Sequence, residues 1–190
     1  MSSPREGLIL AQPRRHIPIG IIVAIVVSLP LFPYLWHKLL HILGAVLFVG
    51  NLVVTAAWMT WAAQRKDANI IAFASTSVNR ADEWFTSPGV LLLLINGLVI
   101  SAAFTGDWLG FLRTPWILAG FILLFLTGGL YGAILRRYQI KMARLSSDAA
   151  QGGTAVPPEF FTVLRNWNIV GGLATILPLL ALYFMVAKPS

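Results

Sequence analysis

The chain has 190 residues, of which 57% are hydrophobic and 11% are charged. Ordinary globular domains carry about a quarter charged residues, so this composition excludes a typical soluble domain. The chain has no cysteine, which excludes disulfides, thiolate metal ligands and the covalent haem-attachment motif.

Five uncharged windows run through the sequence, and each is about as long as the roughly 20 apolar residues that a helix needs to cross a bilayer. The windows are residues 17–37, 39–64, 84–106, 114–135 and 166–187. None shows the strict alternation of apolar and polar residues that is typical of a membrane β-strand. Because backbone in lipid must satisfy its own hydrogen bonds, the windows are expected to be helices. The sequence therefore predicts an all-α polytopic membrane bundle with five transmembrane helices.

The cationic residues of this chain gather in three of the segments between and before the windows. The formal net charge is +7, and the arginines and lysines concentrate in residues 1–16, 65–83 and 136–165. Cationic loops mark the cytoplasmic side, which predicts a cytoplasmic N-terminus and an outer C-terminus in the bacterial cytoplasmic membrane. The charge is thus a topology signal, and nucleic acid is not an expected partner.

The first window contains three prolines, and its uninterrupted apolar core is short. The prolines are Pro18, Pro30 and Pro33. No small-residue cleavage motif follows the apolar core, so we interpret the window as a retained signal-anchor helix rather than a cleaved signal peptide. This interpretation divides the chain into a cytoplasmic tail at 1–16, an N-terminal transmembrane helix at 17–36 and a four-helix bundle at 37–190.

The second window carries a polar stripe. At 100° per residue, six side chains fall within about 40° of one line along the helix. They are His37, His41, Gly44, Phe48, Asn51 and Thr55. Polar side chains in a bilayer generally face protein interior or water. The stripe is therefore expected to face the inside of the bundle.

The two histidines of the stripe are candidate ligands. Neutral imidazole binds haem iron well, so His41, and less strongly His37, could hold haem b. The alternative is that both rings lie in the headgroup layer at the outer end of the helix, where an imidazole needs no ligand. No third ligand accompanies the pair, and no metal site is predicted. Copper handling is a weaker idea, because the four methionines do not gather near the histidines.

The later windows carry signals for helix ends and loops. Ser87-Pro88 and Thr114-Pro115 each place a hydroxyl before a proline, which is the pattern of a helix start. Residues 67–83 are expected to form a short helix near the interface. Residues 136–145 are expected to extend the fourth helix into the cytoplasm. Composition predicts a flexible cytoplasmic loop at 146–158.

Several further polar residues are candidates for the bundle interior. They are Arg80, Asp82, Asn96, Tyr131, Arg165 and Asn168. Helix packing with hydrogen bonds between helices is the favoured explanation for most of them. Asp82 and Glu83, near Arg80, indicate either a buried ion pair at the cytoplasmic mouth or, as is more usual, a solvated cluster at the membrane end. No carboxylate is expected deep in the bilayer, which disfavours a proton-driven transporter.

Two longer segments carry a family resemblance. Residues 41–51 (His-Ile-Leu-Gly-Ala-Val-Leu-Phe-Val-Gly-Asn) and 78–89 (Val-Asn-Arg-Ala-Asp-Glu-Trp-Phe-Thr-Ser-Pro-Gly) resemble a bacterial family of predicted integral membrane proteins of unknown function. Residues 35–46 (Leu-Trp-His-Lys-Leu-Leu-His-Ile-Leu-Gly-Ala-Val) and the closing Ala-Lys-Pro are remotely similar to HemJ-type proteins, which are linked to protoporphyrinogen oxidation. That similarity implies a four-helix core with His41 as a haem ligand. The lysine early in the third helix of that family has no counterpart in residues 116–120.

Two function classes follow. The first is a non-catalytic helical bundle that acts as a scaffold, accessory subunit or conduit, and it is the one we favour. The second is a haem-b-binding oxidoreductase of the HemJ type with His41 as an axial ligand. No catalytic residue is identified. The lipid bilayer is the expected partner, and protein partners and oligomeric state are left open.

Overall fold

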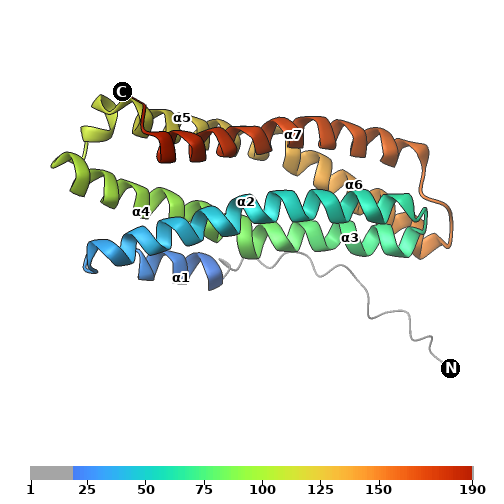
Figure 1. Cartoon of the computed structure of the whole chain (residues 1–190). Coiled ribbons are helices and arrows are strands. Elements are labelled where there is room, and N and C mark those ends of the chain that lie inside the picture. Colours follow the sequence, from blue (N-terminus) through green and yellow to red (C-terminus); the bar gives the residue numbers. More distant parts are fainter. Residues whose placement is uncertain (1–18, 190) are drawn as a thin grey trace.

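The computed structural model describes residues 19–189, and within this range the chain is helical and contains no strand (Figure 1). Two π-helical turns (η2 and η4) and one 3-10 turn (η3) join or follow the α-helices. The elements are α1 (Ile19–Val27), α2 (Tyr34–Gln64), α3 (Ala68–Ala81), η2 (Asp82–Thr86), α4 (Ser87–Thr105), η3 (Gly110–Arg113), α5 (Pro115–Leu130), η4 (Tyr131–Leu135), α6 (Arg136–Gly152) and α7 (Pro158–Ala187).

Four helices within the described residues are long and apolar enough to cross a membrane. They are Tyr34–Gln64, Ala68–Thr105, Pro115–Gly152 and Pro158–Ala187. In Ala68–Thr105, the π-helical turn η2 joins α3 to α4. In Pro115–Gly152, the π-helical turn η4 joins α5 to α6. At 1.5 Å per residue, a helix of 38 residues is about 57 Å long. These helices therefore extend well beyond a hydrocarbon core of about 30 Å.

The prediction of a fifth spanning helix is wrong. Between the start of the described residues and Pro30, the helical part of the first window is α1, which has nine residues. Nine residues rise about 14 Å, which is less than half of the hydrocarbon core. Pro30 and Pro33 cannot donate backbone hydrogen bonds, and α2 begins directly after Pro33. The predicted cytoplasmic tail at 1–16 lies outside the described residues.

Instead of spanning, α1 folds back beside the start of α2 and packs on α4 (Figure 1). The indole nitrogen of Trp36 donates to the Val27 carbonyl at 2.9 Å, which closes the turn between α1 and α2. The Asn96 amide nitrogen donates to the Ser28 hydroxyl at 2.7 Å, and Ser28 is fully buried. These bonds fix α1 against the bundle.

The helix predicted to begin at Ser87-Pro88 begins much earlier, because the chain is helical without a break from Ala68 to Thr105. Ser87 is not an N-cap, since its hydroxyl donates backward to the Asp82 carbonyl at 3.0 Å. Pro88 has no N–H to offer the carbonyl one turn earlier, and η2 accommodates the missing bond. The expected short helix at 67–83 is confirmed as α3, but it continues into the membrane segment.

The flexible loop predicted at 146–158 is shorter than expected. The start of α5 at Pro115 and the extension of the fourth helix as α6 are both confirmed. However, α6 continues to Gly152 and ends at Gly153, which has a positive φ of 63°. The Ser146 hydroxyl donates to the Met142 carbonyl within α6 at 2.8 Å. Ser146 and Ala149 are buried against neighbouring helices, and this packing keeps the segment helical although its composition is typical of a loop.

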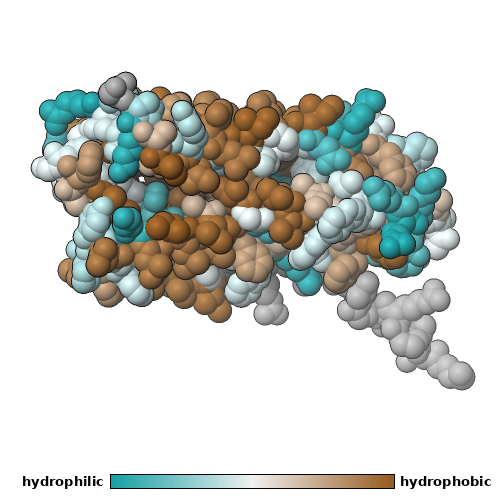
Figure 2. All heavy atoms as spheres, viewed as in Figure 1, coloured by the Kyte–Doolittle hydropathy of each residue, from teal (hydrophilic) through white to brown (hydrophobic). Residues whose placement is uncertain are grey.

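The tight hydrophobic core lies at the end of the molecule formed by α3 and α6. Met59, Ile71, Met142 and Phe160 are each at most 1% exposed there. The rest of the long helices carries exposed apolar side chains, and Figure 2 shows a broad apolar band between more hydrophilic ends. Only 11% of the most apolar window of α7 is buried within the protein. These surfaces are suited to contact lipid.

The long helices pack in pairs. Within the apolar band, α2 packs along α4, and α5 packs along α7. At the other end, α3 packs along α6 (Figure 1). The π-helical turns lie between the part where α2 packs on α4 and α5 on α7 and the part where α3 packs on α6. The candidate site lies beside these turns.

Candidate functional site

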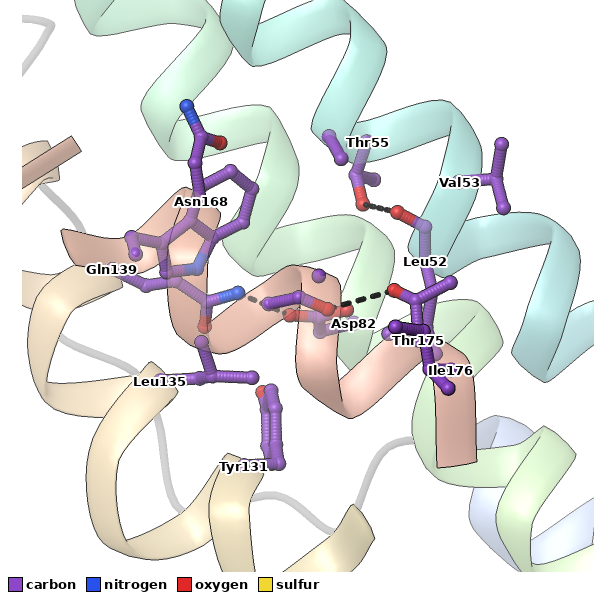
Figure 3. A pocket seen from close by; sticks show the side chains of 14 residues that line it. Leu52, Val53, Thr55, Asp82, Tyr131, Leu135, Gln139, Asn168, Thr175 and Ile176 are labelled. Carbon is purple, nitrogen blue, oxygen red and sulfur yellow. Dashed lines mark hydrogen bonds between the residues drawn. The ribbon is translucent and has the colours of Figure 1, made fainter. Parts of the chain in front are cut away.

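The centre of the site is the buried carboxylate of Asp82, at the start of η2. Its side chain is 3% exposed. One carboxylate oxygen accepts hydrogen bonds from the Asn51 amide at 2.9 Å and from the Thr86 hydroxyl at 2.8 Å. The other accepts from the Gln139 amide at 2.8 Å (Figure 3). Asp82 thus ties together η2, α2 and α6.

A cavity of about 450 Å³ lies beside this carboxylate. Its walls come from α2, η2, η4, α6 and α7, and its polar lining includes Thr55, Asp82, Tyr131, Gln139, Trp167 and Thr175 (Figure 3). Small-molecule sites in proteins commonly measure about 300–1,000 Å³. The cavity therefore has the size of a ligand site.

The cavity opens toward the apolar surface of the protein. Val53 of α2 and Ile176 of α7 both line it and are 52% and 53% exposed. Leu52 and Leu135 add apolar wall inside. A molecule bound here would have polar contacts on one side and an apolar exit on the other.

Two buried polar atoms of the lining have no hydrogen-bond partner among the described residues. They are Oε1 of Gln139 and Nε1 of Trp167. The side chains are 4% and 5% exposed, so water at the protein surface does not reach these atoms. Asp82 fixes the Gln139 orientation, because a carboxylate accepts only from the NH₂ group of the amide. An unpartnered acceptor and an unpartnered donor thus remain within the wall of the cavity, and neither atom is exposed to the cavity itself.

Both π-helical turns contribute to this cavity. Asp82 opens η2, while Tyr131 and Leu135 begin and end η4. Single π turns within α-helices occur frequently at functional sites. Their convergence on one cavity, from two different long helices, supports a functional reading of the site.

The two histidines of the sequence analysis lie at a second polar cluster, between α1, α2 and α4. Nδ1 of His37 is 2.7 Å from the Asn96 side-chain oxygen, and His37 is 1% exposed. Asn96 uses its amide nitrogen for Ser28, so the oxygen accepts and His37 donates through Nδ1. Nδ1 of His41 donates to the Leu93 carbonyl at 2.9 Å. Where either ring is neutral, its proton is therefore on Nδ1 and Nε2 carries none.

The predicted inward stripe of α2 is confirmed by burial. His37, Gly44, Phe48 and Thr55 are buried, while His41 and Asn51 are partly buried and hydrogen-bonded to other helices. His37 is enclosed by protein, and the position of both rings relative to the headgroup layer stays a prediction. The stripe joins two different polar clusters along one helix.

The remaining predicted residues divide between the clusters and the surface. Tyr131 and Asn168 line the cavity, although Asn168 is exposed and its amide points away from Asp82 (Figure 3). Arg80 and Arg165 are exposed and belong to neither cluster. Among the described residues Arg80 forms no ion pair with Asp82 or Glu83, and Asp82 bonds to neutral donors instead. The alternative of a solvated cluster is wrong for Asp82, which is buried, while Glu83 is exposed. Asp82 is buried within the protein, and the expectation that no carboxylate lies deep in the bilayer stays a prediction.

Three residues of the site escaped the sequence analysis: Thr86, Gln139 and Trp167. Gln139 lies between Arg137 and Lys141, in a segment that charge marks as a cytoplasmic extension. Its spacing of eight residues from Tyr131 places both near one helix face, which is the signal that could have found it. Trp167, Gly171 and Thr175 repeat every four residues and share the α7 face that lines the cavity.

The polar groups of the cavity are largely engaged with one another or with their own helices. Asp82 is the ionisable acid of the cavity, and three donors already hold it. The hydroxyls of Thr55 and Thr175 donate to carbonyls of their own helices. Among residues 19–189, no group of three histidine or acidic side chains is placed to hold a metal ion.

Comparison with known proteins gives one match. A family model described as a predicted integral membrane protein (DUF2269) matches residues 35–189. No curated protein and no solved structure matches the chain. The match covers α2 to α7 and leaves α1 outside. It confirms the resemblance to an uncharacterised membrane family, while the similarity to HemJ-type proteins stays a prediction.

Proposed function

Because the chain belongs to the DUF2269 family of predicted integral membrane proteins, we propose that it is a non-catalytic binding scaffold that holds a small amphipathic molecule in the cavity beside Asp82. One observation carries the proposal. Polar side chains from several elements, Asp82 and Tyr131 among them, line a cavity of about 450 Å³ that opens on the apolar surface. A cavity that combines polar groups with an apolar opening suits a molecule with a polar head and an apolar tail.

Filling the cavity is expected to displace the bound molecule. Gly172 of α7 lines the cavity, and a Cβ added there meets no atom within 4 Å. We expect wild-type protein ejected from a nanodisc to carry an added small-molecule mass in native mass spectrometry. The Gly172→Phe variant is expected to lose that mass, because the ring occupies the cavity.

Gly128→Phe is the matched control for that experiment. Gly128 also has open space around it, but it does not line the cavity. The control variant should keep the added mass. A wild-type protein without added mass, or a Gly172→Phe variant that retains it, would contradict the binding proposal.

We also propose an orientation. The connections at 65–67 and 153–157 lie at one end of the bundle, and the α4–α5 connection and the C-terminus lie at the other (Figure 1). Most described cationic residues belong to the first end, which is expected in the cytoplasm of a bacterial inner membrane. They are Arg65, Lys66, Arg80, Arg136, Arg137, Lys141, Arg144 and Arg165.

Single cysteines test the orientation directly, because the natural chain has none. Leu109, between α4 and α5, is 61% exposed, and Thr154 lies in the exposed connection between α6 and α7. A membrane-impermeant maleimide should label Leu109→Cys in intact spheroplasts and Thr154→Cys only after permeabilisation. The opposite labelling pattern would reverse the orientation.

A second candidate function, haem-b binding at His41, is favoured by one specific hydrogen bond. A haem-ligating histidine typically donates one ring nitrogen to a carbonyl or carboxylate and offers the other to the iron. Nδ1 of His41 has such a bond to Leu93, which leaves Nε2 as the ligating nitrogen. His37 is one helical turn earlier on the same helix, so it cannot bind the opposite face of the same haem. These residues therefore fit one axial ligand.

The haem candidate predicts a Soret band in the detergent-purified protein that shifts on dithionite reduction. His41→Ala should remove the band, whereas His37→Ala should keep most of it. A wild-type protein that stays colourless after haem is added would eliminate this candidate and leave the cavity proposal unaffected.

A further inference from the structure

The lining of the cavity carries one formal charge, and it is negative. Asp82 is the only carboxylate among the described residues that line the cavity, and none of them is a lysine, an arginine or a histidine. An anionic head group would meet only the like charge of Asp82, which repels it. A cationic head group would meet only an opposite charge, which attracts it.

No ion pair neutralises the charge of Asp82. Its three hydrogen-bond donors, Asn51, Thr86 and Gln139, are neutral. Arg136 is the cationic residue whose charge acts on Asp82, but it is exposed and forms no ion pair within the part of the chain that the structure describes. A charge in an apolar wall is screened far less than one in water. The carboxylate therefore attracts a cation in the cavity without direct contact.

Tyr131 adds a polar group on the wall of the same cavity. Its side chain begins η4 and is half-buried, and its hydroxyl points toward Asp82 (Figure 3). A phenolic hydroxyl can donate and accept at the same time. The Tyr131 hydroxyl can thus be oriented toward the carboxylate and still accept from an N–H group of a ligand. An ammonium group matches this pair, because it is positively charged and only donates.

The apolar walls indicate what the ammonium group is attached to. Val53 and Ile176 are half-exposed at the opening of the cavity. An alkyl chain leaving the cavity there would remain in an apolar environment, which is favourable for each CH₂ group. The volume of about 450 Å³ accommodates a head group and the first part of such a chain.

We infer that the cavity recognises the ammonium head of a single-chain cationic amphipath, with the Asp82 carboxylate attracting the charge and the Tyr131 hydroxyl accepting a hydrogen bond from it. This inference rests on the proposed binding function and specifies its ligand class. It requires no covalent step, and the alkyl chain enters and leaves through the bilayer.

The test uses the full-length protein with 3-fluorotyrosine in phosphatidylcholine nanodiscs, followed by ¹⁹F NMR. The chain has four tyrosines, and the Tyr131 signal is identified by its absence in Tyr131→Phe. Tyr34 and Tyr183 are 46% and 61% exposed, so their signals report general effects of each probe on the bilayer. Decylammonium, decan-1-ol and decanoate have the same chain length and differ in the head group. Each is titrated by its measured mole fraction within the bilayer.

Decylammonium is expected to shift the Tyr131 signal saturably, at mole fractions that leave Tyr34 and Tyr183 unchanged. Decan-1-ol can also donate to the Tyr131 hydroxyl, but it has no charge. It should bind about tenfold more weakly, as the difference between a charged and a neutral hydrogen bond predicts. Decanoate should be the weakest of the three probes, because Asp82 repels it.

Two variants test whether Asp82 is the source of this preference. Asp82→Asn removes the charge and keeps the shape of the side chain, so it should reduce the preference for decylammonium over decan-1-ol to about onefold. Glu83→Gln is the matched control, because Glu83 is the next residue of η2 and is exposed. It removes the same formal charge at the surface and should keep the preference at about tenfold.

The remaining outcomes separate the two levels of the proposal. Equal binding of the three probes, tightest binding of decanoate, or a preference that persists in Asp82→Asn would overturn the inference of a cationic ligand and retain the cavity as a binding site. If no probe shifts Tyr131 beyond the changes in Tyr34 and Tyr183, both the ligand class and the binding function are overturned.

Discussion

Replacing Asp82 with alanine is expected to lower the free energy of unfolding by about 3 kcal/mol, more than any other single polar substitution in the bundle. Hydrogen bonds between transmembrane helices average only about 0.6 kcal/mol, so an isolated bond would not have this effect. Asp82 differs because three buried or partly buried donors lose one shared acceptor at once. Each unsatisfied buried group costs about 1–3 kcal/mol, with partial relief where a donor finds another partner.

Asp82→Asn is expected to be milder, at about 1 kcal/mol. The new amide retains one accepting oxygen for Asn51 and Thr86. Its nitrogen would face the Gln139 nitrogen, but Gln139 can turn its amide and accept through the oxygen that now has no partner. The unpartnered atom therefore makes the asparagine variant tolerable.

Unfolding in mixed micelles with a denaturing detergent, followed by circular dichroism, measures these differences. Glu83→Ala is the matched control, because Glu83 follows Asp82 in the same π turn and is exposed. It should change stability by less than about 0.5 kcal/mol. Equal effects of Asp82→Ala and Glu83→Ala would show that the Asp82 hydrogen bonds contribute nothing to stability.

The second large effect is expected where α2 and α4 cross. A Cβ added at Gly44 would lie 2.8 Å from the Gly89 carbonyl oxygen and 2.9 Å from the Leu93 backbone nitrogen. These are backbone atoms, so the helices must move apart rather than repack a side chain. Gly44→Ala should therefore cost about 2 kcal/mol, within the usual range for overpacking, and Gly44→Leu should cost more.

A double-variant cycle with Gly89 tests this explanation. A Cβ at Gly89 would lie 3.0 Å from the Gly44 carbonyl oxygen, so both substitutions strain the same contact. Once the first methyl group has separated the helices, the second should cost less than it does alone. Additive effects in the same unfolding assay would contradict a shared close approach.

Gly50→Ala and Gly128→Ala are the controls for this cycle. Neither position has an atom within 4 Å of an added Cβ. Alanine has a higher helix propensity than glycine, by up to about 1 kcal/mol, so these variants should be neutral or slightly stabilising. Destabilisation of the controls equal to that of Gly44→Ala would mean that helix packing is not the cause.

The four membrane helices were predictable because a helix that crosses the bilayer core needs about 20 consecutive residues without charge. The first window was predicted wrongly, because Pro30 and Pro33 end the helix well before its apolar residues end. The inward face of α2 was also predictable, because that helix is regular from Tyr34 to Gln64 and 100° spacing holds throughout.

The cavity was less predictable, and the reasons are local. Asp82 stands in the run Arg80-Ala81-Asp82-Glu83, and its charged neighbours resemble a solvated end of a membrane helix. Gln139 is surrounded by cations in the same way. The burial of both depends on packing between α3 and α6, which are far apart in the sequence. No local pattern contains that information.

The π turns also set the relative phase of the two halves of each long helix. A π turn bonds residue i to i+5 instead of i+4, so it adds one residue to the helix. At 100° per residue, that addition turns every later side chain by more than a quarter of a circle. In α3 one phase directs Ile71 and Val78 into the core, and in α4 another directs Leu92 and Asn96 toward α1 and α2. The number of residues between these positions, and not only their identity, therefore decides which faces meet protein and which meet lipid.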